Sequence, residues 1–264
     1  MAARMSFVVL ALLALVVSRA NAAHPTLVEP FDVMPSLHGH LLVSDRAAGV
    51  VYDLDPATGN GSAVANVPQA RELARLPDGR LLVTSDDRVL VVSAGSHATR
   101  VFARAEASIL GLAVAGDGSL FVSENVPGSD DTTVVRLRGR TRTVLVSGLR
   151  GVHGILVVRH GLVLSEAYGG RVLALDLRTR RLRVLAHGLG NPSFTLPAPG
   201  GGYYVSEFTG NRVSRVSPDG HVQVVAAVSQ PGPIAFDDRG RIVGVTIDGT
   251  IFRIERRHAH TIYR

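Results

Sequence analysis

The sequence contains no cysteine, no tryptophan and no lysine, and only 5% of its 264 residues are aromatic. The absence of cysteine excludes a small disulfide-stabilised domain and a cysteine-ligated zinc or iron–sulfur centre. All 28 basic residues are arginine, so the net charge of +6 reflects a bias of the whole chain rather than a placed basic site. With 46% apolar and 19% charged residues, the chain can bury a large core and is not disordered in composition.

The first 22 residues predict export. Arg4 precedes an uninterrupted apolar run over residues 7–17, and Ala20-Asn21-Ala22 fits the small-x-small pattern of a cleavage site. This run is shorter than the roughly 20 residues that a membrane span needs. We therefore predict a signal peptide over residues 1–22, no transmembrane segment, and a secreted protein, extracellular or periplasmic, formed by residues 23–264. An exported protein does not meet genomic DNA or cellular RNA, so we expect no nucleic-acid partner.

One phrase, a glycine followed by apolar residues and a hydroxyl side chain, recurs six times after this segment. Its hydroxyl residues are spaced by 40, 39, 42, 41 and 40 positions and are Ser44, Thr84, Ser123, Ser165, Ser206 and Thr246. A regular period of 20 to 50 residues predicts a repeat architecture in which each copy is one structural unit.

Each repeat predicts four short strands. An apolar run such as Ile109–Val114 precedes the phrase, alternating segments such as Arg212–Val216 follow it, and Asp-Gly turns separate them. A four-stranded sheet cannot bury both faces alone, so such units pack radially around an axis. The fold class is therefore all-β: a six-bladed β-propeller with four antiparallel strands per blade. The ring could close by pairing residues 26–28 with the last blade, or residues 260–263 could form that blade's own outer strand.

The repeats resemble known propeller families over the whole mature chain. Residues 191–194, 202–207 and 210–220 resemble an NHL repeat, and residues 29–30, 42–45 and 51–59 resemble the opening blade of the SMP-30/gluconolactonase propellers. Virginiamycin B lyase has repeats of the same style. The resemblance implies a six-bladed ring with an axial pocket, but these relatives include lactonases, lyases and binding modules, and fold does not confer function.

In such propellers the pocket is lined by the starts of the innermost strands. The first positions of these strands are Asp32, Glu72, Gly111, Gly154, Ser193 and Pro233. The residues just before them are Phe31, Arg71, Leu110, His153, Pro192 and Gly232.

The resemblance also implies a divalent cation. Gluconolactonase-like enzymes hold such a metal through Glu, Asn and Asp side chains near these strand starts, which here suggests Glu29, His153 and Asn191 as ligands of calcium, magnesium or zinc. The set is incomplete, because Gln230-Pro231-Gly232 stands where the family has Asp-Gly. His153 could act as a general base, with Arg71 or Tyr168 orienting a substrate. His153 could equally be a hydrogen-bonded rim residue, and Asn191 an ordinary turn residue.

Four acidic residues follow the repeated hydroxyl at equivalent places: Asp45, Glu124, Glu166 and Glu207. A ring of acids could bind a cationic ligand. Repetition also indicates a scaffold role, in which each carboxylate accepts backbone N–H groups, and we favour that interpretation.

Two groups of arginines lie at equivalent places in neighbouring repeats: Arg136, Arg138, Arg140 and Arg142, then Arg178, Arg180, Arg181 and Arg183. Alternation would place the first four guanidinium groups on one strand face. Such a band could bind an acidic glycan or an anionic surface, although solvated outer strands explain it equally.

These observations predict a secreted, monomeric propeller that binds a small molecule or extracellular ligand at its axial pocket or loop face. The alternative is a divalent-metal-dependent hydrolase, such as a gluconolactonase-like lactonase, or a lyase acting in the same pocket.

Overall fold

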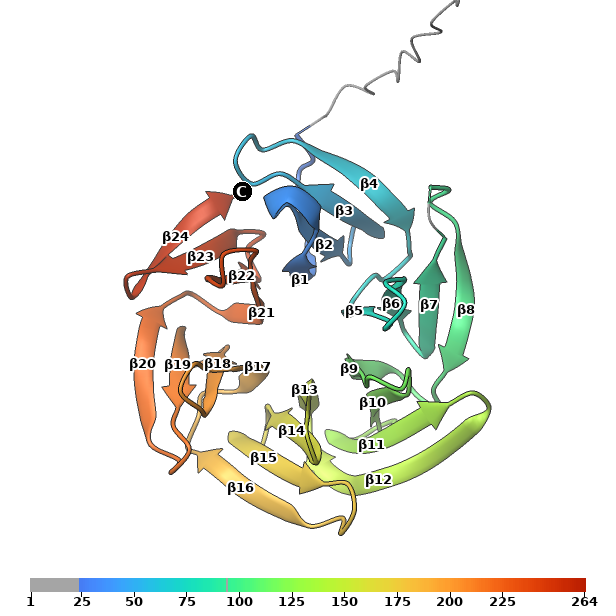
Figure 1. Ribbon diagram of the computed structural model, residues 1–264, viewed down its shortest axis with the longest axis vertical. Coiled ribbons are helices and arrows are strands. Elements are labelled where there is room, and N and C mark those ends of the chain that lie inside the picture. The colour runs from blue at the N-terminus through green and yellow to red at the C-terminus, as the bar shows by residue number, and fades with distance from the viewer. Residues whose placement is uncertain (1–23, 94) are drawn as a thin grey trace, which may run out of the picture.

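The computed structural model describes residues 24–93 and 95–264, which form six four-stranded antiparallel sheets around a central axis (Figure 1). In every sheet the strands follow one another in chain order, from the axis outwards. The predicted six-bladed β-propeller is therefore confirmed. The predicted signal peptide lies outside the described residues.

The strands are short and evenly distributed over the six blades. Blade 1 holds β1 (Pro30–Pro35), β2 (Leu41–Asp45), β3 (Val50–Leu54) and β4 (Gly61–Asn66), with the 3₁₀ turn η1 (Leu37–Gly39) between β1 and β2. Blade 2 holds β5 (Leu73–Arg75), β6 (Leu81–Ser85), β7 (Arg88–Val92) and β8 (Thr99–Arg104). Blade 3 holds β9 (Ile109–Val114), β10 (Leu120–Asn125), β11 (Asp131–Arg138) and β12 (Thr141–Arg150).

The second half of the ring repeats this plan. Blade 4 holds β13 (Val152–Val158), β14 (Gly161–Glu166), β15 (Arg171–Asp176) and β16 (Leu182–His187). Blade 5 holds β17 (Pro192–Pro197), β18 (Tyr203–Glu207), β19 (Arg212–Val216) and β20 (Val222–Ala227). Blade 6 holds β21 (Pro231–Phe236), β22 (Ile242–Thr246), β23 (Ile251–Glu255) and β24 (His258–Tyr263). No helix in the described part of the chain is long and apolar enough to cross a membrane.

The Asp-Gly pairs form tight turns inside the blades. Gly118, between β9 and β10, has a φ of +78°, which L side chains rarely adopt. The Asp117 carboxylate accepts the N–H of Ser119 at 3.0 Å, so the aspartate completes the turn that the glycine permits.

Three of the repeated hydroxyls connect neighbouring blades. Ser44 Oγ accepts the N–H of Asp32 in its own blade and donates to the carbonyl of Arg71 in the next one. Ser123 Oγ likewise donates to the carbonyl of Val152 in blade 4. The register of the inner strand shifts opposite both serines, which frees inner-strand groups from the ladder to bond elsewhere. Ser165 Oγ forms a third such contact, 2.5 Å from Thr195 Oγ1 of blade 5. Thr246 instead bonds Asp248 and the Thr250 carbonyl of its own blade, so the interblade role holds for three of the six hydroxyls.

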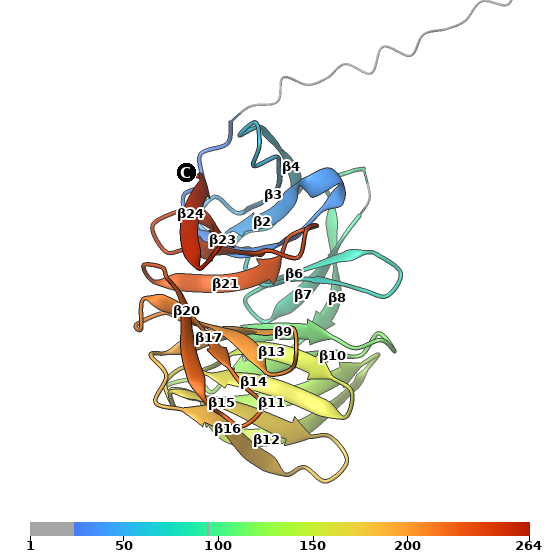
Figure 2. The same ribbon diagram turned by 60° about the vertical axis from the view of Figure 1, so that its left-hand side comes forward.

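The core lies between the blades and closes the ring. The inner strands β9, β13, β17 and β21 lie beside one another (Figure 2). One apolar cluster joins Val33, Leu41 and Val43 of blade 1 to Val243 and Ile251 of blade 6.

Ring closure follows the second of the two predicted routes. Residues 260–263 belong to β24, the outer strand of blade 6, whereas residues 26–28 form no strand. Blade 1 and blade 6 are each built from one continuous segment, so the ring is held by packing between them. The N-terminal segment adds polar contacts, because the Tyr263 hydroxyl donates to the Pro25 carbonyl at 2.5 Å.

Candidate functional site

All six blades line one cavity of about 390 Å³ near the axis. The inner strand or the segment just before it contributes Phe31, Arg71, Leu110, His153, Ser193 and Pro233, one from each blade. The turns after the second strands contribute Arg46, Tyr168, Phe208 and Ile247. A mainly apolar concave site with a few converging polar groups is the usual form of a small-molecule pocket.

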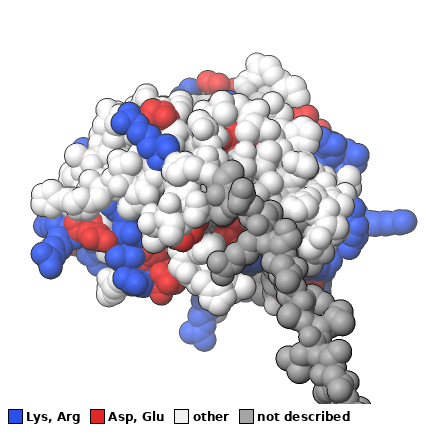
Figure 3. Space-filling model, turned by 90° about the horizontal axis from the view of Figure 1, so that it is seen from above, with Lys and Arg blue, Asp and Glu red and all other residues white. Residues whose placement is uncertain are grey.

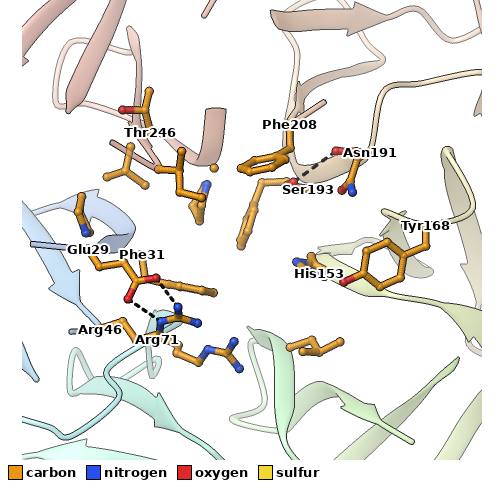
Figure 4. Close-up of a pocket in the computed structure, with 17 residues that line it drawn as sticks. Glu29, Phe31, Arg46, Arg71, His153, Tyr168, Asn191, Ser193, Phe208 and Thr246 are labelled. Atoms are coloured by element: carbon orange, nitrogen blue, oxygen red, sulfur yellow. Dashed lines mark hydrogen bonds and ion pairs between the residues drawn. The ribbon is translucent and has the colours of Figure 1, made fainter. Parts of the chain in front are cut away.

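The side of the pocket formed by blades 1 and 2 carries the charge (Figure 4). Glu29 and Arg46 form a two-point ion pair, in which Arg46 Nε donates to Glu29 Oε2 at 2.9 Å and Arg46 Nη2 donates to Glu29 Oε1. The Arg71 guanidinium stacks on the Phe31 ring with its Cζ 5.0 Å from the ring centre. Burial lowers the pKa of Arg71, and the positive charge of Arg46 lowers it further.

His153 lies on the opposite side of the pocket, beside Tyr168 (Figure 4). The two rings meet edge to face with their centres 5.9 Å apart. Burial lowers the pKa of His153 to about 4, with a smaller effect from the charge of Arg71, so the imidazole is neutral at physiological pH. Its Nε2 is buried and has no hydrogen-bond partner among the described residues.

Gly151 explains how Tyr168 reaches this position. A Cβ at Gly151 would lie 2.4 Å from the Tyr168 ring, and the φ of Gly151 is +62°. Only glycine therefore suits both the backbone turn and the ring packed on it. Asn191 also lines the pocket, in the turn before β17, with a φ of +53°. Asparagine tolerates this left-handed conformation well, so its turn role is evident from the backbone.

The three predicted metal ligands all line the pocket, but they form a poor donor set. Glu29 is already paired with Arg46 and lies across the cavity from His153 (Figure 4). No group of three or more His, Asp or Glu residues in the described chain is placed to hold a metal ion. One paired carboxylate, one neutral imidazole and one amide do not fit calcium or magnesium, which take six or more oxygen ligands.

Two acidic residues predicted to start inner strands do not reach the pocket, and β1 begins at Pro30 rather than at the predicted Asp32. Asp32 and Glu72 do not line the pocket but are buried beside it, between blades 1 and 2. Asp32 Oδ2 accepts the N–H of Leu73 in the next blade at 2.8 Å. Burial raises the pKa of Asp32 to about 7, although the N–H groups of Leu73 and Val33 oppose this. Burial, reinforced by the charge of Asp32, raises the pKa of Glu72 well above its ordinary value.

None of the four repeated acids lines the pocket, and each has scaffold contacts instead. Each accepts a backbone N–H from the segment before its own blade's inner strand. The donors are Val28 and Glu29 for Asp45, Glu106 for Glu124, Arg150 for Glu166 and Gly190 for Glu207. Arg142, Arg171 and Arg212 pair with the three glutamates. Their role in ligand binding stays a prediction, and none of the four lies on the surface of the axial pocket.

The arginines of the predicted band do not share one strand face. Arg136 and Arg138 lie on β11, Arg140 lies in the turn, and Arg142 lies on β12. Arg136 pairs with Asp117, and Arg142 pairs with Glu106 and Glu124. The turn at Gly139, which has a φ of +57°, separates these arginines onto two strands, so their alternation in the sequence does not place them on one strand face. In the view of Figure 3, carboxylates lie among the arginines at one edge of the molecule.

Several pocket residues escaped the sequence-based prediction. Arg46 and Phe208 stand two positions after the repeated hydroxyl, and Ile247 stands one position after it. These positions differ in type from repeat to repeat, whereas the hydroxyl does not. Variable residues one or two positions after a hydroxyl that every repeat keeps could have identified these pocket residues from the sequence.

Searches with the sequence return no relatives, since no protein-family model and no curated protein matches. Solved structures do match the fold. The calcium-binding protein regucalcin from Agrobacterium tumefaciens is 14% identical with a TM-score of 0.76, covering 92% of this chain and 94% of that one. A gluconolactonase from Xanthomonas campestris is 16% identical with a TM-score of 0.72, covering 84% of each chain.

A virginiamycin B lyase from Staphylococcus aureus is 12% identical with a TM-score of 0.61, covering 89% of this chain and 84% of that one. This chain shares their propeller fold. The structural match confirms the fold that the resemblance predicted. Because the sequence identities are low, the chemistry of the site has to be argued from its own residues.

Proposed function

We propose that this protein binds a small organic molecule in its axial pocket, as a monomer that works outside the cytoplasm. The observation that carries the proposal is the convergence of all six blades on one cavity of about 390 Å³ with apolar walls and few polar groups. A cavity of this size suits a small ligand. Export is part of the proposal and is supported by the sequence of residues 1–22.

A variant that fills the pocket tests this proposal. Gly232 lines the cavity, and a Cβ there would be 3.5 Å from its nearest neighbours, which is ordinary contact. Gly232→Leu should therefore fill the cavity without straining the fold. Gly116 is exposed and has open space around it, so Gly116→Leu is the matched control.

The experiment is a saturation-transfer NMR screen of small polar and apolar compounds against residues 24–264. We expect compounds that bind the wild type and Gly116→Leu but not Gly232→Leu. Equal binding of the compounds to all three proteins would contradict a ligand site at the axis. The absence of any bound compound would contradict it as well. Mass spectrometry of the bound compounds after incubation reports whether any is turned over.

The metal-dependent hydrolase or lyase is the second candidate. What favours it is that Glu29, His153 and Asn191 line a single pocket, as the predicted ligands should. Thermal shifts with calcium, magnesium, manganese and zinc test it. A rise in the midpoint that Glu29→Ala and His153→Ala both remove would support the enzyme. An unchanged midpoint with all four ions would reject it.

A further inference from the structure

Arg71 is the charged residue of the pocket that has no carboxylate partner within the described chain. Its backbone is fixed on both sides, because its N–H donates to the Thr84 carbonyl at 3.0 Å and its carbonyl accepts from Ser44 Oγ at 2.5 Å. The side chain therefore starts from a rigid point at the seam of blades 1 and 2. Its position follows from the repeat and not from an ion pair.

The guanidinium of Arg71 is held by one face and leaves most of its N–H groups unused. The face rests on Phe31, and Nη1 makes one long hydrogen bond of 3.4 Å to the Ile109 carbonyl. Nε is buried without a partner. A guanidinium that is stacked on a ring keeps its edge available for the two parallel bonds that a carboxylate accepts. Arg46 differs, since Glu29 already occupies its edge.

The charges around Arg71 do not neutralise it by contact. Glu72 is next in the chain, but burial raises its pKa well above the ordinary value and so disfavours its charged form. Glu29 is bound to Arg46, and Asp86 is exposed and forms no ion pair with Arg71. His153, across the cavity, is neutral. One positive charge therefore faces a mainly apolar cavity, where a charge without a partner is costly.

We propose that the natural ligand is a small monoanion, a carboxylate with an apolar body, whose carboxylate binds the edge of Arg71. This rests on the proposed function of the axial pocket. The apolar body would contact the wall formed by Leu110, Phe194, Phe208, Pro233 and Ile247. A monoanion fits because the pocket offers one guanidinium without a partner, and a second negative charge would be buried uncompensated.

His153 extends the proposal to a second contact. Its Nε2 is the other pocket nitrogen that is buried and unpartnered. Because the imidazole is neutral, it adds hydrogen-bonding capacity without adding a charge. A hydroxyl or carbonyl oxygen on the ligand, on the side away from the carboxylate, would suit it.

Matched pairs of acids and amides test the charge directly. The probes are 3-phenylpropionate with 3-phenylpropanamide and hexanoate with hexanamide, titrated by calorimetry or NMR at pH 7.5. We expect each acid to bind about tenfold or more tightly than its amide, the usual scale for a charged hydrogen bond. Arg71→Met should remove this preference and leave the amide affinity unchanged, while Arg71→Lys should retain part of it.

Arg75→Met is the matched control, because Arg75 ends β5, the strand that Arg71 precedes, and is exposed outside the axial pocket. It should bind both members of each pair as the wild type does. Equal binding of acid and amide by the wild type, with both lost in Gly232→Leu, would overturn the anion proposal and leave the pocket function standing. Failure of every acid to bind would overturn the proposal that the ligand is a monoanionic carboxylate. Tighter binding of phenyl phosphate than of the acids would overturn it too. Failure of the wider screen would remove the pocket function itself.

Discussion

Two sets of buried acids have opposite roles in this propeller. Glu166 and Glu207 belong to the repeated ring and are fully enclosed by arginine and backbone donors. Asp32 lies within β1 and Glu72 just before β5, and the equivalent residues of blades 3 and 4 are Gly111 and Gly154. The first set repeats with the blades and builds them. The second set breaks the repeat, beside the pocket.

The pKa of Glu207 moves in the opposite direction from the pKa values of Asp32 and Glu72. Burial alone would raise the pKa of Glu207, but hydrogen bonds from Arg212, Ser214 and the Gly190 N–H outweigh it, so the pKa is lowered. This carboxylate stabilises the fold above the unfolded pKa, and the contribution is lost as the pH falls. Asp32 and Glu72 have raised pKa values, so the fold loses stability as the pH rises above about 4. Whether a buried carboxylate stabilises the fold at neutral pH therefore depends on the number of hydrogen-bond donors around it.

The largest effect is expected at Glu207. Glu207→Ala leaves the Ser214 hydroxyl and the Gly190 N–H without their acceptor, and each such unsatisfied donor costs about 1–3 kcal/mol. The Arg212 side chain also loses its partner but is 35% exposed, so water replaces part of that contact. Urea denaturation at pH 7 measures the loss. The exposed Asp78, which pairs with Arg80, provides the control, because Asp78→Ala should leave the midpoint unchanged. A loss for Glu207→Ala as small as the control's would remove the contrast between the two sets.

Glu72→Gln should act in the opposite direction. The glutamine is neutral at every pH, so it removes the cost of keeping or ionising a buried acid whose Oε1 has no partner in the described chain. We expect the thermal midpoint to rise relative to the wild type at pH 8.5 and to change little at pH 4.5. Glu106→Gln, at an exposed carboxylate, is the control. Parallel midpoint curves for wild type and Glu72→Gln across this range would show that Glu72 titrates normally.

The repeated hydroxyls should give an intermediate loss. Ser123 is buried, and its Oγ donates to the Val152 carbonyl at 2.6 Å. Ser123→Ala leaves this interblade acceptor unpaired, which costs about 1–2 kcal/mol. Ser147→Ala removes an exposed hydroxyl and serves as the reference for chemical denaturation. If both substitutions had the same effect, the hydroxyl would recur for a reason other than joining the blades.

The smallest effect on stability is expected from the exposed arginines at the outer strand of blade 4. Arg181 and Arg183 are exposed, and exchanging both for glutamine should leave the thermal midpoint unchanged. The same double variant tests the predicted acidic-glycan contact, because it should elute from heparin at lower salt. Unchanged elution would leave the arginine clusters as solvated turns and strands.

Much of the architecture was readable from the chain. The spacing of the six hydroxyls fixed six units, and the strands predicted at Ile109–Val114 and Arg212–Val216 are β9 and β19. Repetition also distinguished Glu166 and Glu207 as scaffold residues. The pocket residues at or just before the inner strands, such as Arg71 and His153, were named because each repeat supplies its own copy of that position.

The sequence by itself determined the number of blades, the turns and the scaffold, because these depend on contacts within one repeat and on their recurrence. Only the tertiary structure decided which side chains share the pocket and which charges neutralise each other. Glu29 and Arg46 are 17 residues apart, and Arg71 and Ile109 are 38 apart, yet each pair meets at the axis. The Glu29–Arg46 pair forms within blade 1, whereas the contact between Arg71 and Ile109 joins blades 2 and 3. Packing between blades decides which groups face Arg71, so no single repeat shows that Arg71 has no carboxylate partner among the described residues.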